Sequence, residues 1–129
     1  MSARYYAIVW INHNAADVFR VNEIEQSKLV VNSHTSQQSL HHRGDGGGDG
    51  GGHAQPPVDT DYFARIAASL NHVGGTLLTG PGEARFELGR YLGETRPDLA
   101  AHVLELETAK HPSDAALVAM ARDHFHLAG

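Results

Sequence analysis

The sequence predicts a three-layer α/β/α protein built on a five-stranded mixed sheet in the order 3-2-1-4-5. Three observations lead to this prediction. The chain before residue 35 contains three strand-like segments with short connections, whereas the chain after residue 59 alternates between helical and strand-like patterns. The first strand-like segment is apolar almost throughout, as is typical of a central strand covered on both faces. The 129 residues suit one domain, 1–129, with one hydrophobic core.

The three segments before residue 35 are rich in aromatic and β-branched residues, which favours strands. The first covers residues 4–12 and the second covers residues 16–22. Because the turn between them is short, we expect these two strands to be antiparallel. The third covers residues 28–34, and we place it at a sheet edge, where Lys28 and its polar neighbours are tolerated.

After residue 59 the apolar residues recur at helical spacing in three segments. The first predicted helix begins at one of the capping residues 59–61 and ends near residue 72, where Gly74-Gly75 is expected to close it. The second begins at Glu83 and stops at Pro97. The third begins after Pro112. Its buried stripe is expected to contain five residues: Leu117, Met120, Ala121, His124 and Phe125.

Two further strands are predicted between these helices, at residues 76–79 and 102–107. Strands joined through a helix run parallel and have right-handed crossovers. The predicted topology is therefore βββαβαβα, with helices on both faces of the sheet. This arrangement is ribonuclease-H-like.

Between the third strand and the first helix, residues 35–58 read TSQQSLHHRGDGGGDGGGHAQPPV without any strand or helix pattern. Half of the chain's fourteen glycines lie between Gly44 and Gly52. Glycine loses the most backbone entropy on ordering, and this stretch offers little apolar area in return. We therefore expect a disordered Gly- and His-rich loop at 35–58, which is long enough to be functional.

Composition excludes several classes of function. Fifteen acidic residues face ten Lys and Arg residues without a basic run, so that the net charge is −5 and a DNA partner is not expected. No apolar run is long enough to span a bilayer, so a membrane partner is not expected either. The absence of cysteine excludes disulfides and thiolate metal sites and fits a cytoplasmic protein.

Three segments carry a resemblance to a known family: AIVWINHNAADVF near the start, VGGTLLTGPGEARFEL at residues 73–88, and HVLELETAKHPSDAALVAMARDHF at residues 102–125. They resemble the middle domain of eukaryotic-type class 1 peptide chain release factors and, more closely, small bacterial translational machinery proteins related to that domain. The resemblance covers nearly the whole chain outside the loop. It implies the same three-layer fold.

In release factors of this type a Gly-Gly-Gln tripeptide lies between the third strand and the first helix and helps water to hydrolyse peptidyl-tRNA. The loop at 35–58 fills that position here but lacks the tripeptide. The nearest match is Gly51-Gly52-His53, with Gln55 two residues later, so that His53 and Gln55 are the candidate catalytic residues. The resemblance favours a non-enzymatic module that binds the ribosome, its RNA or tRNA, without a cofactor.

The turn Gly80-Pro81-Gly82-Glu83 joins a strand to a helix, and open α/β sheets bind ligands at such strand ends. Gly80, Gly82, Glu83 and Arg85 are therefore candidate binding residues, and Arg43 of the loop adds a positive charge. The turn has no following Lys-Ser or Lys-Thr, so it is not a nucleotide P-loop. Tight strand-to-helix turns also need glycine for purely structural reasons.

The histidines His41, His42 and His53, with Asp45 or Asp49, are candidate ligands for a divalent metal, although their spacing matches no standard zinc motif. A metal-dependent nuclease of this fold needs an acid on the first strand, which is absent. His111 is expected to serve the turn before the last helix.

Four functions remain as alternatives. They are a ribosome- or RNA-binding module, a peptidyl-tRNA hydrolase acting through the loop, a metal-binding module, and a homo-oligomer that pairs through the edge of its third strand.

Overall fold

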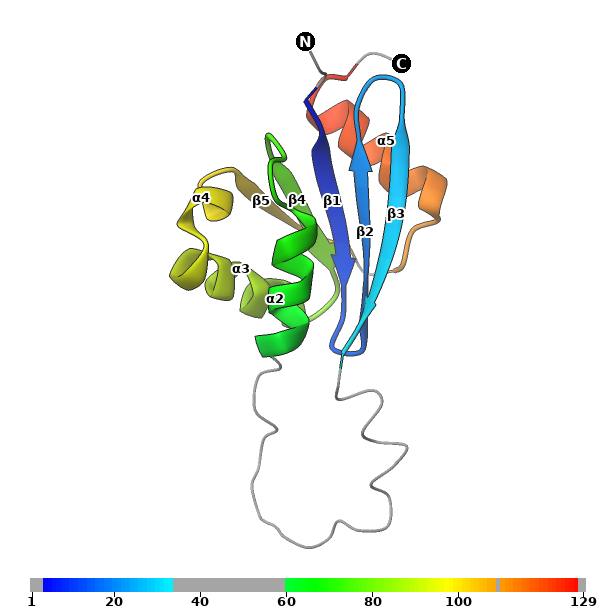
Figure 1. Ribbon diagram of the computed structural model, residues 1–129. Coiled ribbons are helices and arrows are strands. Elements are labelled where there is room, and N and C mark those ends of the chain that lie inside the picture. Colours follow the sequence, from blue (N-terminus) through cyan, green and yellow to red (C-terminus); the bar gives the residue numbers. More distant parts are fainter. Residues whose placement is uncertain (1–3, 34–59, 109, 128–129) are drawn as a thin grey trace, which may run out of the picture.

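The computed structural model of the chain describes residues 4–33, 60–108 and 110–127 (Figure 1). The loop predicted at 35–58 lies outside these described residues. The described elements follow in the order β1 (Tyr6–Ile11), β2 (Ala15–Val21), β3 (Gln26–Asn32), α2 (Thr60–Ser69), β4 (Thr76–Gly80), α3 (Ala84–Thr95), α4 (Pro97–Ala100), β5 (Val103–Glu107) and α5 (Asp114–His124).

The five strands form one mixed sheet in the order β3-β2-β1-β4-β5, which confirms the predicted order. β1 lies at the centre, antiparallel to β2 and parallel to β4, so that Ile8 pairs with Phe19 on one side and with Leu77 on the other. β3 is antiparallel to β2, and β5 is parallel to β4. β3 and β5 are therefore the two edges of the described sheet.

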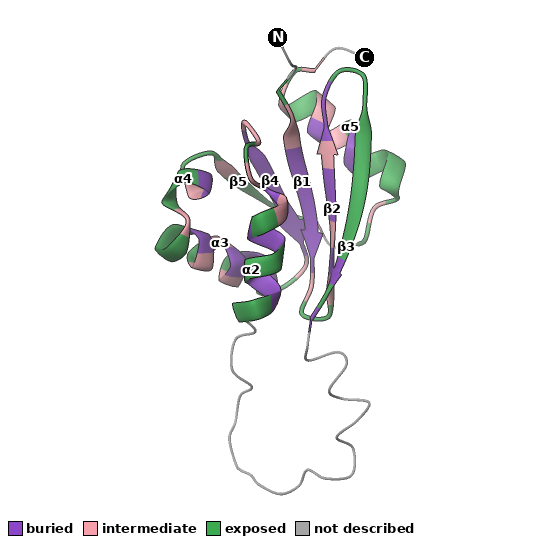
Figure 2. Ribbon diagram, in the orientation of Figure 1, coloured by how far each residue is buried: buried purple, intermediate pink, exposed green. Residues whose placement is uncertain are grey.

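Helices cover both faces of this sheet. α2, α3 and α4 lie on one face, and α5 lies on the other (Figure 1). The buried residues form two hydrophobic cores, one on each face of the sheet, and alternate side chains of β1 belong to different cores. Val9 and Ile11 pack in the core under α2 and α3. Ile8 and Trp10 pack in the core under α5. Buried residues accordingly run along β1 from Ala7 to Ile11 and along the inner sides of the helices (Figure 2). This two-sided burial is why the first strand is apolar almost throughout.

The end of α2 differs from the prediction. His72, with φ +68°, takes the left-handed conformation that was assigned to Gly74-Gly75. The two glycines are needed for packing instead. A Cβ on Gly75 would lie 2.7 Å from Cε1 of Phe125, and one on Gly74 would lie 2.4 Å from Cδ of Arg4.

A short helix that the sequence did not predict, α4, follows α3 directly. Pro97 was expected only to stop α3, but it also occupies the first turn of α4, where its missing N–H costs nothing. Arg96 between the two helices donates two hydrogen bonds to Asp98, at 3.1 and 3.0 Å, and a third to Oδ1 of Asn71 at 2.7 Å. These bonds fix the change of direction between α3 and α4.

The buried stripe of α5 also differs from the prediction. Leu117, Val118 and Ala121 are buried, whereas His124, which was expected to be buried, is exposed with its ring edge against Phe125. The prediction of the helix start is confirmed, because Oγ of Ser113 accepts a hydrogen bond from the Ala116 N–H at 3.1 Å.

Candidate functional site at the carboxyl end of the central strand

The end of β3 and the start of α2 are both attached to the turn between β1 and β2. The Ser33 N–H donates to the Asn14 carbonyl at 2.9 Å, and the Tyr62 hydroxyl donates to the Asn12 carbonyl at 2.9 Å. The turn itself is held by Oδ1 of Asn12, which accepts from the N–H groups of Asn14 and Ala15. The chain therefore leaves the described fold after Ser33 and re-enters it at α2 on either side of one turn, at the carboxyl end of β1.

A further contact joins the two attachment points directly. Arg65 of α2 donates from Nη2 to the carbonyl of Asn32, the last residue of β3, at 2.7 Å. Its Nε lies 3.1 Å from Oδ2 of Asp61, one helical turn earlier. Because Asp61 orients this guanidinium, α2 is fixed against β3 at the point where the described chain is interrupted.

The turn between β4 and α3 lies at the same end of the sheet. Gly80 has a φ of +140°, and a Cβ on it would lie 2.2 Å from the carbonyl oxygen of Ile11. Gly82 has a φ of +70° but has open space around its Cα. Both glycines are thus explained by backbone conformation, and Gly80 also by its close approach to β1. Glu83 is exposed and makes no capping hydrogen bond with its side chain.

Arg85 is buried and belongs to this turn. Its Nη1 donates to the Gly80 carbonyl at 2.8 Å, and its Nε lies 3.8 Å from Oε1 of Glu105 on β5. The guanidinium also lies 4.2 Å from the ring centre of Phe86, which accounts for the position of this half-exposed aromatic residue on the outer side of α3. Arg85, a residue of α3, therefore contacts both β4, through the Gly80 carbonyl, and β5, through Glu105. A ligand-binding role for Gly80, Gly82, Glu83 and Arg85 stays a prediction.

Two histidine–carboxylate pairs at this end of the sheet were missed by sequence reasoning. Nε2 of His13 lies 3.3 Å from Oε1 of Glu87, and Nε2 of His111 lies 3.0 Å from Oδ2 of Asp17. The His111 ring also stacks on Trp10, with 3.9 Å between ring centres. His111, expected to serve only the turn before α5, thus joins that turn to β1 and β2. No local pattern signals either pair, because the partners are far apart in the sequence.

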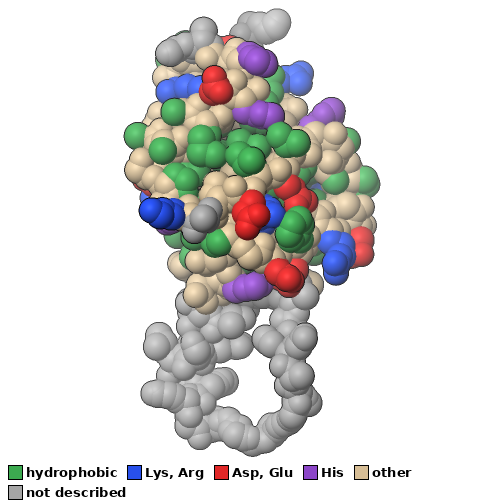
Figure 3. Space-filling view, turned by 180° about the vertical axis from the view of Figure 1, so that it is seen from behind, with side chains coloured by type: hydrophobic (Ala, Val, Ile, Leu, Met, Phe, Trp, Pro, Cys, Tyr) green, Lys and Arg blue, Asp and Glu red, His purple; other side chains and the backbone are tan. Residues whose placement is uncertain are grey.

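Three basic side chains near this end of the sheet each have a carboxylate partner. Arg65 lies beside Asp61, Arg85 beside Glu105, and Lys28 lies 3.0 Å from Asp114. The far side of the molecule shows charges of both signs interspersed around a broad apolar area (Figure 3). This side of the described molecule therefore shows no basic face of the kind that holds nucleic acid through its phosphates (Figure 3).

The loop candidates lie outside the described residues: Arg43, His41, His42, His53, Gln55, Asp45 and Asp49. Within the described ranges, no group of three or more His, Asp or Glu side chains is placed to hold a metal ion. Among the same residues, no helix is long and apolar enough to cross a bilayer.

Comparison with solved structures shows a fold similar to two archaeal Pelota proteins and to an archaeal translation termination factor. The fold matches Pelota from Archaeoglobus fulgidus with a TM-score of 0.61 at 11% identity, over 95% of this chain and 32% of that one. It matches Pelota from Thermoplasma acidophilum with a TM-score of 0.61 at 18% identity, over 98% of this chain and 35% of that one. The archaeal translation termination factor aRF1 matches with a TM-score of 0.53 at 12% identity, over 95% of this chain and 38% of that one.

No protein-family model and no curated protein matches the chain. The chain spans about a third of the length of each of these solved structures. At these identities the similarity shows the fold, which is an α/β fold shared with part of Pelota and of an archaeal termination factor.

Proposed function

We propose that this chain is a translation-associated module, similar to the middle domain of eukaryotic-type class 1 release factors and its bacterial relatives, that binds the ribosome or its RNA without catalysing peptide release. One observation carries the proposal. The chain between β3 and α2 leaves and re-enters the fold at the carboxyl end of β1, between Ser33 and Tyr62. The family resemblance places the Gly-Gly-Gln tripeptide in this interval. The fold similarity to an archaeal translation termination factor supports the same assignment.

The absence of catalysis follows from the sequence of this interval. Gly51-Gly52 is followed by His53 where the tripeptide has glutamine, and Gln55 comes two residues too late. The glutamine of the tripeptide that the resemblance connects with hydrolysis is therefore missing from its place.

We assign the contact with the ribosome to the segment between β3 and α2, because the arginines described beside this segment are already paired or buried. Arg65 is bound to Asp61, and Arg85 is buried. Arg43 and the neighbouring histidines supply the positive charge that approaches phosphate groups. We include tRNA among the partners on the same chemical grounds, and we place the protein in the cytoplasm with the ribosome.

Cosedimentation with ribosomes tests the proposal. The parent protein should appear in the ribosomal fraction at low salt, and a variant with residues 41–53 replaced by a short Gly-Ser linker, which removes Arg43 and the loop histidines, should not. Circular dichroism and thermal melting of the linker variant should match the parent, since the residues that build the two described cores all lie outside the replaced segment. Persistent absence of the parent from ribosomal fractions at low salt would reject the proposal.

A salt titration sharpens the test. If Arg43 contacts one phosphate, Arg43→Gln should lower the slope of log Kobs against log salt by about 0.7–0.9. Arg90→Gln, a matched removal of one exposed charge on α3, should leave the slope unchanged. Peptide release from peptidyl-tRNA by the parent, lost in the linker variant, would instead establish a hydrolase and overturn the non-catalytic part of the proposal.

A further inference from the structure

The outer side of β3 is an open sheet edge in the described part of the chain. The Ser33 N–H donates to Asn14 and the Glu25 carbonyl accepts from Asn22, so the odd-numbered residues of this antiparallel ladder face β2. The even-numbered residues Lys28 and Val30 therefore direct their N–H and C=O groups outward. No described strand pairs with this side of β3. At the end of the strand the outward carbonyl of Asn32 already accepts a hydrogen bond from Arg65. The N–H and C=O groups of Lys28 and Val30, in the middle of the edge, are therefore the groups offered to a new strand.

β3 also lacks the features that usually keep an edge strand from pairing. It runs for seven residues without proline, and its register with β2 is continuous. Its single charge, Lys28, is bound to Asp114 at 3.0 Å and lies over the Phe19 ring. Leu29 and Val30, on opposite faces, are each 48% exposed. The outer edge of β3 therefore presents exposed apolar side chains beside backbone groups that have no strand partner.

We propose that β3 pairs with β3 of a second copy of this chain, antiparallel and with the two-fold axis at Leu29. In this register Lys28 and Val30 hydrogen-bond with the partner's Val30 and the partner's Lys28, respectively. Leu29 then faces Leu29 of the partner subunit as a non-hydrogen-bonded pair, in which side chains approach most closely. The result is one continuous ten-stranded sheet with closed symmetry.

Charge favours a second copy at this edge over the opposite one. In the β3 pairing no two like charges stand directly opposite each other, because each Lys28 faces a valine. β5 is the other edge, and its full-length antiparallel self-pairing would place Glu105 opposite the partner's Glu105. Like charges placed directly opposite each other destabilise a strand pair. Self-pairing is therefore assigned to β3.

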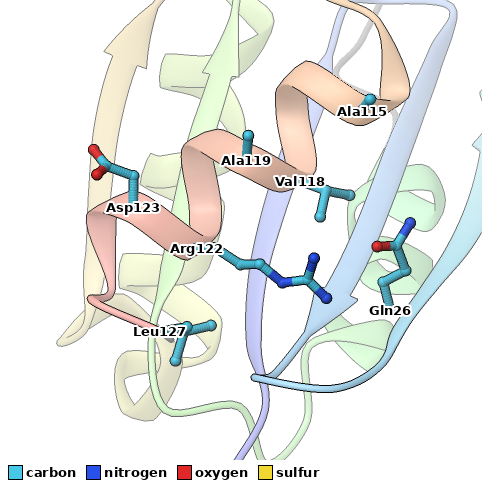
Figure 4. Close-up of a pocket in the computed structure, with 7 residues that line it drawn as sticks. All are labelled: Gln26, Ala115, Val118, Ala119, Arg122, Asp123 and Leu127. Atoms are coloured by element: carbon cyan, nitrogen blue, oxygen red, sulfur yellow. The ribbon is translucent and has the colours of Figure 1, made fainter. Parts of the chain in front are cut away.

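A groove on the β3 side of α5 extends the surface. It has a volume of about 390 Å³ and lies between β3 and α5 (Figure 4). Val118 and Arg122 project from α5 toward Gln26 of β3. The residues that line it are Gln26, Ala115, Val118, Ala119, Arg122, Asp123 and Leu127. Because the two-fold axis is perpendicular to the sheet, both α5 helices and their grooves lie on the same face of the ten-stranded sheet.

Cysteine crosslinking tests the register, since the chain has no cysteine of its own. Leu29→Cys should form a disulfide-linked dimer on mild oxidation, because residue 29 faces its own copy. Lys28→Cys should not, because the two substituted positions are offset along the strands. Leu104→Cys on β5 is a matched control with 49% exposure, and it should remain monomeric. Equal crosslinking at residues 29 and 104 would overturn the proposal.

Charge exchange tests the pairing without a covalent bond. Sedimentation velocity of the parent should give the mass of two copies, whereas Leu29→Lys and Leu29→Glu should each sediment as monomers with an unchanged far-UV circular dichroism spectrum. An equimolar mixture of the two variants should recover the dimer. A monomeric parent at 100 μM, or a dimer that persists in Leu29→Glu, would reject the pairing. The inference does not depend on ribosome binding, so the two proposals stand or fail separately.

Discussion

Gly80→Ala is the sharpest test of the packing at the carboxyl end of β1. Gly80 has a φ of +140°, and a Cβ there would lie 2.2 Å from the Ile11 carbonyl oxygen and 3.2 Å from its carbonyl carbon and its nitrogen. The obstacle is the backbone of the central strand, which cannot rotate away as a side chain can. The substitution therefore combines conformational strain with overpacking.

These two costs set the magnitude. A residue held in a sparsely populated backbone region loses about 1–3 kcal/mol, and overpacking a well-packed site costs about 1–3 kcal/mol. We expect Gly80→Ala to lower the free energy of unfolding by about 3–5 kcal/mol, a large part of the about 5–15 kcal/mol of a typical domain. With a urea m-value of about 2 kcal/mol/M, the unfolding midpoint should fall by about 2 M.

Two other glycines are matched controls in the same urea assay. Gly82 has a φ of +70° and open space, so Gly82→Ala should cost only the left-handed conformation, about 1–2 kcal/mol. Gly93 lies in α3 with open space and without a positive φ, so Gly93→Ala should stabilise by about 0.5–1 kcal/mol. A Gly80→Ala variant within about 0.5 kcal/mol of the parent would refute the packing argument.

Two further predictions concern helix ends and can be checked on the isolated chain. Ser113→Ala removes the hydrogen bond from the Ala116 N–H at the start of α5 and should cost about 1 kcal/mol; for a domain of this size the melting temperature should fall by about 4 °C, and an unchanged value would contradict the cap. The hydrogen bonds from Arg96 hold the pKa of Asp98 below its ordinary value, so that the stability from this pair is complete above the ordinary pKa and declines as pH falls through the folded one. In Arg96→Gln an NMR carboxyl titration should show the Asp98 pKa rising toward its ordinary value, and an unmoved pKa would exclude Arg96 as the cause.

The fold was predictable because its signals are local and repeated. The alternation in β2 places Val18 in one core and Phe19 in the other, and the apolar run of β1 requires a cover on both faces. Short turns imply antiparallel neighbours and helical connections imply parallel ones, so the strand order followed from the connections together with the apolar run that makes β1 central.

Errors occurred where two signals competed or where packing chose between nearly equal faces. Pro97 follows the end of α3 and is also the first residue of α4. The sequence predicted the end of α3 but not the beginning of α4. In α5 the sequence allowed a stripe through His124, but the sheet under the helix buries Val118 and leaves His124 exposed. A rotation of the helix by a fraction of a turn decides between these two faces, and the residues of the helix alone do not specify it.

The sequence by itself determined the strand order, the two-sided core and the position of residues 34–59 between β3 and α2. These depend on periodicity, turn length and connection type, which are local properties of the chain. Only the tertiary structure decided that His111 meets Asp17 and Trp10, that Arg85 is buried against Gly80 and Glu105, and that Gly80 has no room for a Cβ beside Ile11. Such contacts join residues distant in sequence, and their distances are set by how helices and strands pack, which no single segment encodes.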